Sequence, residues 1–221
     1  MKGLFNKNPH TKLFDRIFTI IILALGTLSF DLYRNCDAKP IMHIYLITKI
    51  FVWIILWVLV RQLYLIIYKD ELTELWNRRY LHIVLDDQMK RLKNKGNLTL
   101  AMIDIDNFKG INDNYGHLQG DRVLFNLSNL LERNVRGNDM VFRWGGEEFI
   151  ILLPNTDEMG AVKVLERLRK NISEYDFNCK ITISCGIVSI KEATDISQFI
   201  GMADKALYEA KKVKNNIVIY Q

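Results

Sequence analysis

Cysteine is scarce in this chain, with three residues among 221: Cys36, Cys179 and Cys185. Their separations match neither a metal-binding spacing nor a pairing pattern, which argues against a zinc centre and against a disulfide scaffold. Cys179 and Cys185 fall in or beside a strand-like run, so we expect them to be small core residues in a reducing compartment. The chain also lacks internal repeats and low-complexity tracts, and its length suits one ordinary domain plus a smaller part.

An excess of positive charge is absent from the C-terminal two thirds of the chain. Residues 70–221 carry 21 Lys and Arg against 22 Asp and Glu, whereas residues 1–69 carry nine basic and three acidic residues. The net charge of +5 therefore gives no indication that the larger part binds nucleic acid, and we expect no nucleic-acid partner. The excess comes from basic residues that flank apolar segments.

Two apolar segments are candidates for transmembrane helices, which need roughly 20 mostly apolar residues. Residues 41–68 satisfy this length, and residues 13–33 are marginal. A polar stretch with Pro40 separates them. A cleaved signal peptide is the alternative for the first segment, but no small-x-small cleavage site follows it. Buried helices of a soluble domain are another alternative, but so short a region could hardly cover such long apolar faces.

Basic residues lie mainly outside the two apolar segments rather than in the loop between them. Lys2, Lys7, Lys12 and Arg16 precede the first segment, and the loop holds only Arg34 and Lys39. The positive-inside rule then places both ends of the chain in the cytoplasm. We expect a multi-pass protein of the inner (cytoplasmic) membrane, with an external loop too short to fold as a sensor domain.

From about Asp70 the hydrophobic pattern alternates between helical and strand periodicities. The spacing predicts helices over 78–94, 121–134, 157–174 and 195–212, and strands over 98–104, 140–144, 148–154, 181–190 and 217–220. This alternation around one hairpin predicts an α/β (α+β) fold with one sheet and helices on its faces. The chain thus divides into a membrane anchor, residues 1–69, and a soluble domain, residues 70–221.

The pentapeptide Gly145-Gly146-Glu147-Glu148-Phe149 lies between two strand-like runs. The two glycines predict a tight hairpin turn, because glycine reaches positive φ without steric cost. We expect both glutamates at an exposed tip, where adjacent acids repel each other unless a cation or water satisfies them. For an isolated pentapeptide of this kind, a solvated hairpin tip is the simpler interpretation.

Asp104 and Asp106 end the first strand of the soluble domain, and strand alternation puts both on one face. If this strand neighbours the hairpin, Asp104 can meet Glu147 and Glu148. Such oxygen ligands suit Mg²⁺, which usually binds through one or two carboxylates plus substrate phosphates. A nucleoside triphosphate bound there would permit metal-assisted phosphoryl transfer. On spacing alone, a solvated and inert acidic strand end remains an open alternative.

Five sequence motifs occur in order between residues 70 and 221. They are Asp70–Arg79 (D-x-L-T-x-L-x-N-R-R), Asp104–Asp113 (D-I-D-x-F-K-x-x-N-D), Gly116–Asp121 (G-H-x-x-G-D), Gly145–Phe149 and Ala203–Lys211 (A-D-x-A-L-Y-x-A-K). Through these motifs the chain resembles GGDEF-domain diguanylate cyclases, with the signature pentapeptide in its Glu form. The resemblance implies the palm-like sheet of nucleotidyl cyclases, flanked by helices and here preceded by two transmembrane helices.

The resemblance implies which residues bind metal and take part in catalysis. Asp104, Glu147 and the backbone carbonyl of Ile105 would hold Mg²⁺ or Mn²⁺, with Glu148 as a further ligand or support. Glu147, Glu148 and Lys109 are the expected catalytic residues. The cofactor is thus a divalent cation held by hard oxygen ligands.

The resemblance also implies a guanine site formed by Asn112 and Asp121. A carboxylate can accept hydrogen bonds from guanine N1–H and the N2 amino group, and an amide can donate to N3. Adenine lacks that pair of donors, so Asp121 disfavours ATP. The alternative for Asn112, taken in isolation, is a local turn cap.

The phosphates of GTP would meet the segment after the first strand and the end of the last long helix. By resemblance, the backbone amides of Asn107, Phe108 and Lys109 face the phosphates, together with the side chains of Lys109 and Lys211. In isolation, each of these lysines is equally well read as a surface residue.

The chain departs from the family pattern after Lys211. The family usually continues with Gly-Arg-Asn, whose arginine contacts the phosphates, but here the residues are Lys214, Asn215 and Asn216. Lys214 can replace part of the charge without the bidentate fork of arginine. We expect weaker triphosphate binding rather than loss of activity, and we expect Asn215→Arg to lower the Michaelis constant for GTP.

Arg136 and Asp139 match the family's R-x-x-D inhibitory site, nine residues before the signature. There the arginine can fork onto guanine or phosphate, and the aspartate can accept from guanine N1 and N2. Arg167 is a candidate partner from the next helix. A surface ion pair is the alternative for so short a pattern. The resemblance therefore implies feedback inhibition by the product.

The implied reaction joins two GTP molecules into cyclic di-GMP (c-di-GMP) with release of two pyrophosphates. Each catalytic domain holds one GTP, so a homodimer is required. A non-catalytic GGDEF module that binds GTP or c-di-GMP as a receptor is the main alternative. An enzyme that makes another cyclic dinucleotide is a third possibility, which Asp121 disfavours. A purely structural membrane hairpin leaves the ordered motifs unexplained.

Overall fold

The computed structural model describes residues 16, 19–20, 24, 26–27, 39–92 and 96–221. The chain divides into two compact units, Met1–Ile67 and Tyr68–Gln221, each described by itself. Helix α2 (Lys39–Tyr68) contains the stretch His43–Tyr68, which is long and apolar enough to cross a membrane by length and composition. Most of the first predicted span, residues 13–33, and the predicted external loop lie outside the described residues.

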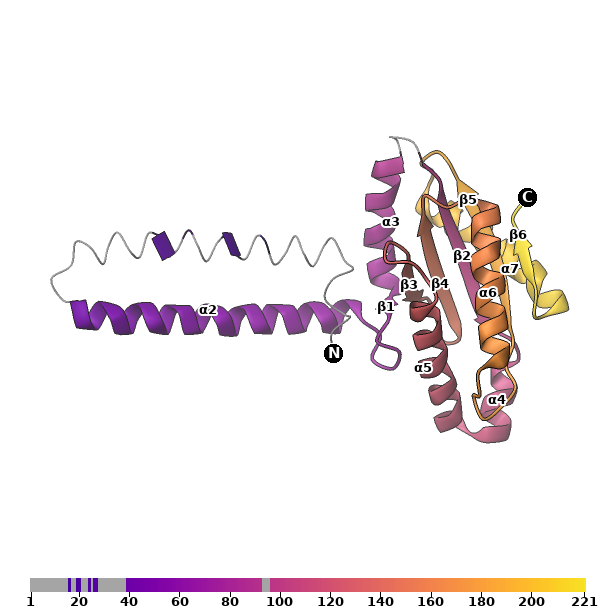
Figure 1. Ribbon diagram of the computed structural model, residues 1–221, viewed down its shortest axis with the longest axis horizontal. Coiled ribbons are helices and arrows are strands. Elements are labelled where there is room, and N and C mark those ends of the chain that lie inside the picture. Colours follow the sequence, from indigo (N-terminus) through magenta and orange to yellow (C-terminus); the bar gives the residue numbers. More distant parts are fainter. Residues whose placement is uncertain (1–15, 17–18, 21–23, 25, 28–38, 93–95) are drawn as a thin grey trace. The chain divides into compact units, whose positions relative to one another are not determined.

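The second unit is built on one six-stranded mixed sheet in the order β1-β3-β4-β2-β5-β6 (Figure 1). The strands are β1 (Trp76–Asn77), β2 (Leu98–Ile105), β3 (Met140–Arg143), β4 (Glu148–Pro154), β5 (Ile183–Ile190) and β6 (Ile217–Ile219). Central strand β2 is antiparallel to both of its neighbours, β4 and β5, whereas β1 and β6 each pair in parallel at an edge. The predicted α+β fold is thus confirmed.

Helices cover both faces of this sheet (Figure 1). They are α3 (Arg78–Leu92), α4 (Phe108–Tyr115), α5 (His117–Arg133), α6 (Glu158–Glu174) and α7 (Ile196–Val213). Buried residues recur at helical spacing along α3, α5, α6 and α7, which gives each of these four helices an apolar stripe facing the sheet. The predicted cap Asp157 accepts a hydrogen bond from the Gly160 amide at 2.8 Å and starts α6.

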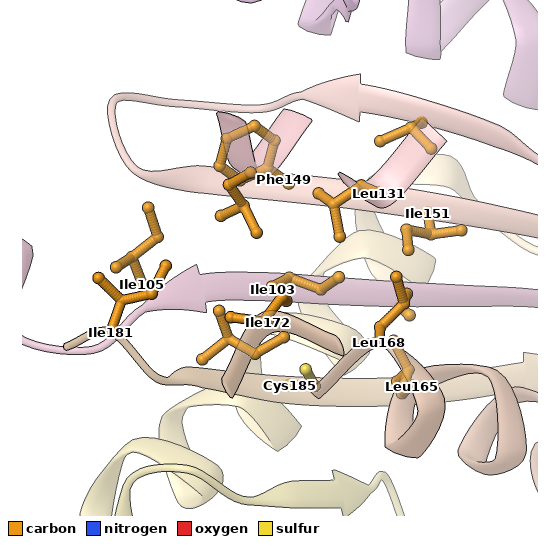
Figure 2. Close-up of a cluster of buried hydrophobic side chains, with 14 of the residues drawn as sticks. Ile103, Ile105, Leu131, Phe149, Ile151, Leu165, Leu168, Ile172, Ile181 and Cys185 are labelled. Carbon is orange, nitrogen blue, oxygen red and sulfur yellow. The ribbon is translucent and has the colours of Figure 1, made fainter. Parts of the chain in front are cut away.

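Alternation along β2 divides its side chains between two apolar layers. Ala101, Ile103 and Ile105 belong to the cluster packed against α5 and α6, much of which appears in Figure 2. The intervening positions, including Asp104, face the opposite layer, since successive strand residues point to opposite faces. The buried Cys185 lies in the first cluster, as expected of a small core residue.

The structure contains elements that the sequence pattern did not predict. Helix α4 is absent from the prediction, and α5 begins at His117 rather than at 121. Helix α4 has only Phe108 and Ile111 buried, so packing rather than helical periodicity stabilises it. Strand β1 is two residues long, too short for any alternation to show.

Candidate active site

Asp104 near the end of β2 and Glu148 at the start of β4 are direct partners in the strand register. Directly opposed residues of antiparallel strands project to the same face of the sheet. Helix α7 packs on β2 and β5, and its Lys211 ammonium lies 2.6 Å from Asp104 Oδ2. The carboxylates of two strands and a cation from α7 therefore meet at one end of the sheet.

Asp104 is buried, with 2% of its surface exposed. One carboxylate oxygen pairs with Lys211, while Oδ1 has no hydrogen-bond partner among the described residues. Burial raises the pKa of Asp104 to about 6, against the lowering effect of Lys211, and the charges of Glu147 and Glu148 add to the rise. Burial likewise raises the pKa of Glu147, which Lys211 opposes. The site thus holds more negative charge than its one lysine compensates.

The signature loop differs from the predicted hairpin turn in two respects. The φ angles of Gly145 and Gly146 lie outside the left-handed region, so positive φ is not the reason for glycine here. A Cβ at Gly145 would lie 2.5 Å from Glu148 Oε2, so any larger residue there would displace the end of the Glu148 side chain. The expectation of an exposed tip is also wrong for the acids, since Glu147 and Glu148 are half-buried against the end of β2.

Arg143 binds the backbone of the signature loop. The sequence motifs did not point to this residue. Its Nη2 donates to the Gly146 carbonyl at 2.7 Å and its Nε to the Gly145 carbonyl at 3.2 Å. Its Nη1 donates to Asp70 Oδ1 at 2.8 Å. Burial acts to raise the pKa of Asp70, but hydrogen bonds from Arg143 and Thr73 outweigh it and keep the pKa below its usual value. One guanidinium thus joins the loop to the start of the domain.

The next residue, Trp144, adds a second contact between the loop and the beginning of the domain. The Arg78 guanidinium lies 4.1 Å from the Trp144 ring centroid, within the range of a cation–π interaction. His82, one turn further along α3, lies with its ring centroid 6.0 Å from that of Trp144. Asp70 and Arg78 belong to a motif that the resemblance had identified, but its contacts with the loop cannot be read from spacing.

The two predicted guanine-binding residues lie close together across helices α4 and α5. A Cβ at Gly120 would lie 2.0 Å from Asn112 Oδ1, so the Asn112 carboxamide rests directly on the residue before Asp121. Asp121 is exposed and Asn112 half-buried. A larger residue at Gly120 would therefore displace the Asn112 carboxamide from its position.

Helix α4 starts directly after β2, so its first backbone amides lie beside the acidic end of the sheet. Asn107, with φ 58°, makes the turn between strand and helix. Phe108 is buried and anchors the turn, while Lys109 is exposed. The early amides of a helix have no partner within it and favour anions.

Asp106 differs from Asp104 in its partners, although both lie at the start of the same motif. Its carboxylate accepts hydrogen bonds from Thr182 Oγ1 at 2.6 Å and Ser184 Oγ at 2.7 Å. It also accepts from the backbone amide of Asn215 at 2.8 Å. Asp106 is therefore hydrogen-bonded to Thr182, to Ser184 on β5 and to the turn after α7. Of these two aspartates, only Asp104 has an oxygen without a partner among the described residues.

The predicted inhibitory residues lie away from this acidic site, between α5 and β3. Asp139 is buried, and its Oδ2 accepts from the Arg136 amide at 2.8 Å. Both residues line a cavity of about 300 Å³ together with Asn97, Asn155, Thr156 and Asp157. Arg167 is not among the lining residues, and its Nη2 donates to the Asn134 carbonyl at 2.6 Å.

A divalent cation fits the donor set at the end of β2. Among the described residues no three His, Cys, Asp or Glu side chains form a ready cluster. The expected set, however, uses the carboxylates of Asp104 and Glu147 and the Ile105 carbonyl, and Mg²⁺ needs only one or two carboxylates beside substrate phosphates. The buried, unpartnered Oδ1 of Asp104 is an atom that a cation would satisfy.

Together, fold and site define an α+β domain with an acidic, cation-suited site where a Gly-Gly-Glu-Glu loop meets the central strand. The family model described as "Diguanylate cyclase, GGDEF domain" matches residues 67–217. The chain therefore belongs to the GGDEF family.

Several known proteins are similar to this chain. Diguanylate cyclase DgcM of Escherichia coli (strain K12) is 39% identical over 153 residues, which cover 68% of this chain and 37% of DgcM. The structure of the coiled coil and GGDEF domain of DgcB from Caulobacter crescentus, in complex with c-di-GMP, has a TM-score of 0.75 at 26% identity and covers 80% of this chain and 98% of that chain.

A third similar protein shares the Glu form of the signature. The active GGEEF domain of a diguanylate cyclase from Vibrio cholerae has a TM-score of 0.59 at 37% identity, over 66% of this chain and 97% of that chain. The chain spans less than half the length of the curated relatives it matches.

Proposed function

We propose that this protein is a diguanylate cyclase that condenses two GTP molecules into c-di-GMP and releases two pyrophosphates. The observation that carries the proposal is the meeting of Asp104 with the Gly-Gly-Glu-Glu loop, in a chain of the GGDEF family. Relatives named as diguanylate cyclases support the same activity.

Asp104, Glu147 and the Ile105 carbonyl would hold the divalent cation, with Glu148 in support. When bound, Mg²⁺ or Mn²⁺ would polarise the attacked phosphate and favour ionisation of the attacking hydroxyl. The net negative charge at Asp104, Glu147 and Glu148 supports this assignment, since Lys211 compensates only part of it.

The remaining residues would orient GTP. Asn112 and Asp121 would read the guanine edge, and their proximity across α4 and α5 supports this role. The amides of Asn107, Phe108 and Lys109 and the ammonium groups of Lys109 and Lys211 would bind the phosphates. Two such half-sites, one in each copy, would bring the 3′-hydroxyl of one GTP to the α-phosphorus of the other, with pyrophosphate as the leaving group.

We further propose a homodimer anchored in the inner membrane with both ends in the cytoplasm. The length and apolar composition of α2 support the anchor, and a reaction that needs two facing copies requires the dimer. The cavity beside Arg136 and Asp139 supports a separate inhibitory site for c-di-GMP. Arg167, held on Asn134, would have to turn to join it.

The test is incubation of the purified full chain with Mg²⁺ and GTP, followed by mass identification of the product. The proposal expects c-di-GMP from the wild type, none from Glu147→Ala, and no cyclic product from ATP. A folded, dimeric sample that binds GTP without forming product would instead support the receptor alternative.

A further inference from the structure

The turn that follows α7 has a backbone conformation that lysine rarely adopts. Lys214 has φ 62° and ψ 161°, a region that is essentially restricted to glycine and destabilising for other residues. Asn215 follows with φ 45°, which asparagine tolerates. The family pattern has glycine where this chain has Lys214, so the strain arises from the lysine at this position.

Each residue of this turn has a backbone atom that is held by a hydrogen bond. The Lys214 amide donates to the Ala210 carbonyl at 3.0 Å, and the Asn216 carbonyl accepts from the Cys185 amide at 2.8 Å. Between them, the Asn215 carbonyl accepts from Arg169 Nη1 at 3.0 Å. The strained conformation is therefore over-determined by its surroundings, as strained segments at functional sites are.

Asp106 is the buried anchor of the turn. It is 6% exposed, and Asp106 Oδ2 accepts from the Asn215 amide at 2.8 Å. Thr182, directly before β5, and Ser184, on β5, bind the same carboxylate, so it cannot follow the turn if the turn relaxes. Hydrogen bonds to an ionised carboxylate are stronger than those between neutral groups.

The turn lies beside the part of the site that would receive the triphosphate. Lys211, one helical turn earlier, pairs with Asp104, while Asn215 is bound to Asp106. The residue after Asp106, Asn107, opens the segment assigned to the phosphates. Lys214 lies between these two attachments and is exposed, so its ammonium is available to an anion at this end of the sheet.

We propose that Asp106 is a positioning residue that, through the Asn215 amide, holds the turn in its strained conformation so that Lys214 meets the triphosphate of GTP. Lys214 then supplies the charge of the arginine that the family pattern has at position 215. This inference rests on the proposed function and explains why a lysine occupies a conformation suited to glycine.

The first test is Lys214→Gly in the purified full chain. Glycine relieves the strain, so the midpoint of thermal unfolding should rise by about 2–4 °C. Affinity for a GTP analogue with a methylene bridge between the α and β phosphorus atoms, measured by calorimetry with Mg²⁺, should fall about tenfold. Affinity for GMP should stay unchanged. A more stable protein with unchanged affinity for the analogue would overturn the inference.

The matched control is Lys212→Met, which removes a charge from the same end of α7. Lys212 pairs with Glu209 at 2.7 Å, and both side chains are 54% exposed. We expect its affinity for the analogue to change less than about twofold. A loss equal to that of Lys214→Gly would show a general effect of charge and would contradict a specific role for Lys214.

The second variant is Asp106→Asn, alone and combined with Lys214→Gly. A single amide oxygen cannot accept from all three donors, so Asp106→Asn should weaken analogue binding but not GMP binding. The double variant should bind the analogue no more weakly than Lys214→Gly, because Asp106 acts through Lys214. Additive losses would overturn the positioning role. A wild-type protein that binds neither nucleotide would overturn the proposed function as well. Variants whose affinity for the analogue equals that of the wild type would overturn only this inference.

Discussion

The ammonium of Lys211 lies 2.6 Å from Asp104 Oδ2 and joins the last turn of α7 to the central strand of the sheet. The other oxygen of Asp104 is buried without a partner among the described residues. Lys211 therefore pairs with only one oxygen of a carboxylate that lies opposite Glu148 in the strand register. A cation that binds Asp104 would either leave the ion pair with Lys211 in place or break it. In the second case, the lysine would be free to bind the phosphates of GTP.

The ionisation of Asp104 should set the acidic limb of activity. Because cation binding needs the carboxylate and its pKa is raised to about 6, kcat/KM for GTP should fall about tenfold per pH unit below that pH. Lys211→Met removes the ammonium that lowers this pKa, so the acidic limb of the variant's pH–rate profile should move to higher pH. Profiles of the wild type and of Lys211→Met check this, and acidic limbs at the same pH would contradict it.

The raised pKa of Asp104 also makes the stability of the domain depend on pH. Since the folded state binds the proton of Asp104 more tightly than the unfolded state, the contribution of this group to the free energy of unfolding should fall as pH rises from about 4 to about 6. Asp104→Asn should flatten that part of the curve. Denaturant unfolding across this pH range measures it, and an equal slope in both proteins would count against the buried, poorly compensated carboxylate.

Arg143 should control the geometry of the signature loop. Arg143→Met removes the donors to both glycine carbonyls and to Asp70, and a displaced catalytic loop costs about 100-fold in rate. Arg143→Lys cannot reproduce the fork and should recover only part of the rate. The readouts are the rate of c-di-GMP formation and hydrogen exchange of the loop amides.

The control for Arg143 is Arg91→Met, which breaks a partly exposed ion pair with Asp87 on α3. We expect its rate and loop exchange to match the wild type, since exposed pairs contribute about 0–1 kcal/mol. Arg143→Met with normal rate and exchange would show that the three hydrogen bonds do not position the loop.

The close packing of α7 on the sheet depends on Gly186 of β5. An added Cβ would lie 2.2 Å from the Leu207 amide nitrogen and 2.4 Å from the Ala203 carbonyl oxygen. Gly186→Ala should therefore lower the free energy of unfolding by about 3 kcal/mol. Gly201 lies on α7, and a Cβ added there would meet no atom within 4 Å. Gly201→Ala should therefore raise the free energy of unfolding by about 0.5–1 kcal/mol. Denaturant titration compares them, and equal effects would contradict the close packing.

Product inhibition should depend on Arg136. If c-di-GMP binds at the cavity that Arg136 lines, Arg136→Ala should raise the inhibition constant for added c-di-GMP by about tenfold. Arg133→Ala, an exposed change three residues earlier at the last residue of α5, should leave the inhibition constant unchanged. Inhibition that is equally strong in Arg136→Ala would remove the assignment.

The sequence predicted the elements whose periodicity is long and regular, and missed those that depend on tertiary contacts. The buried stripes of α3, α6 and α7 and the fully buried β2 are visible as hydrophobic patterns. Helix α4 has only two buried residues, and β1 is two residues long. Neither carries enough residues for a period to show.

The candidate site shows the same division. The resemblance to the family implied Asp104, Asn112, Asp121 and the signature acids as a set, but not the contacts among motifs. The bond from Arg143 to Asp70 spans 73 positions, and that from Asn215 to Asp106 spans 109. Such pairings follow from how strands and helices pack, which local patterns do not encode. The expected reason for glycine at 145 was also wrong, since the φ angle of Gly145 is not positive and its close neighbour is the Glu148 side chain.

The most direct test of the central claim is a stoichiometric measurement on the full chain. Purified protein with Mg²⁺ and GTP should form one c-di-GMP for every two pyrophosphates, and Glu147→Ala should form neither. A folded, dimeric protein that binds GTP but yields no c-di-GMP, or releases pyrophosphate without the cyclic dinucleotide, would contradict the account.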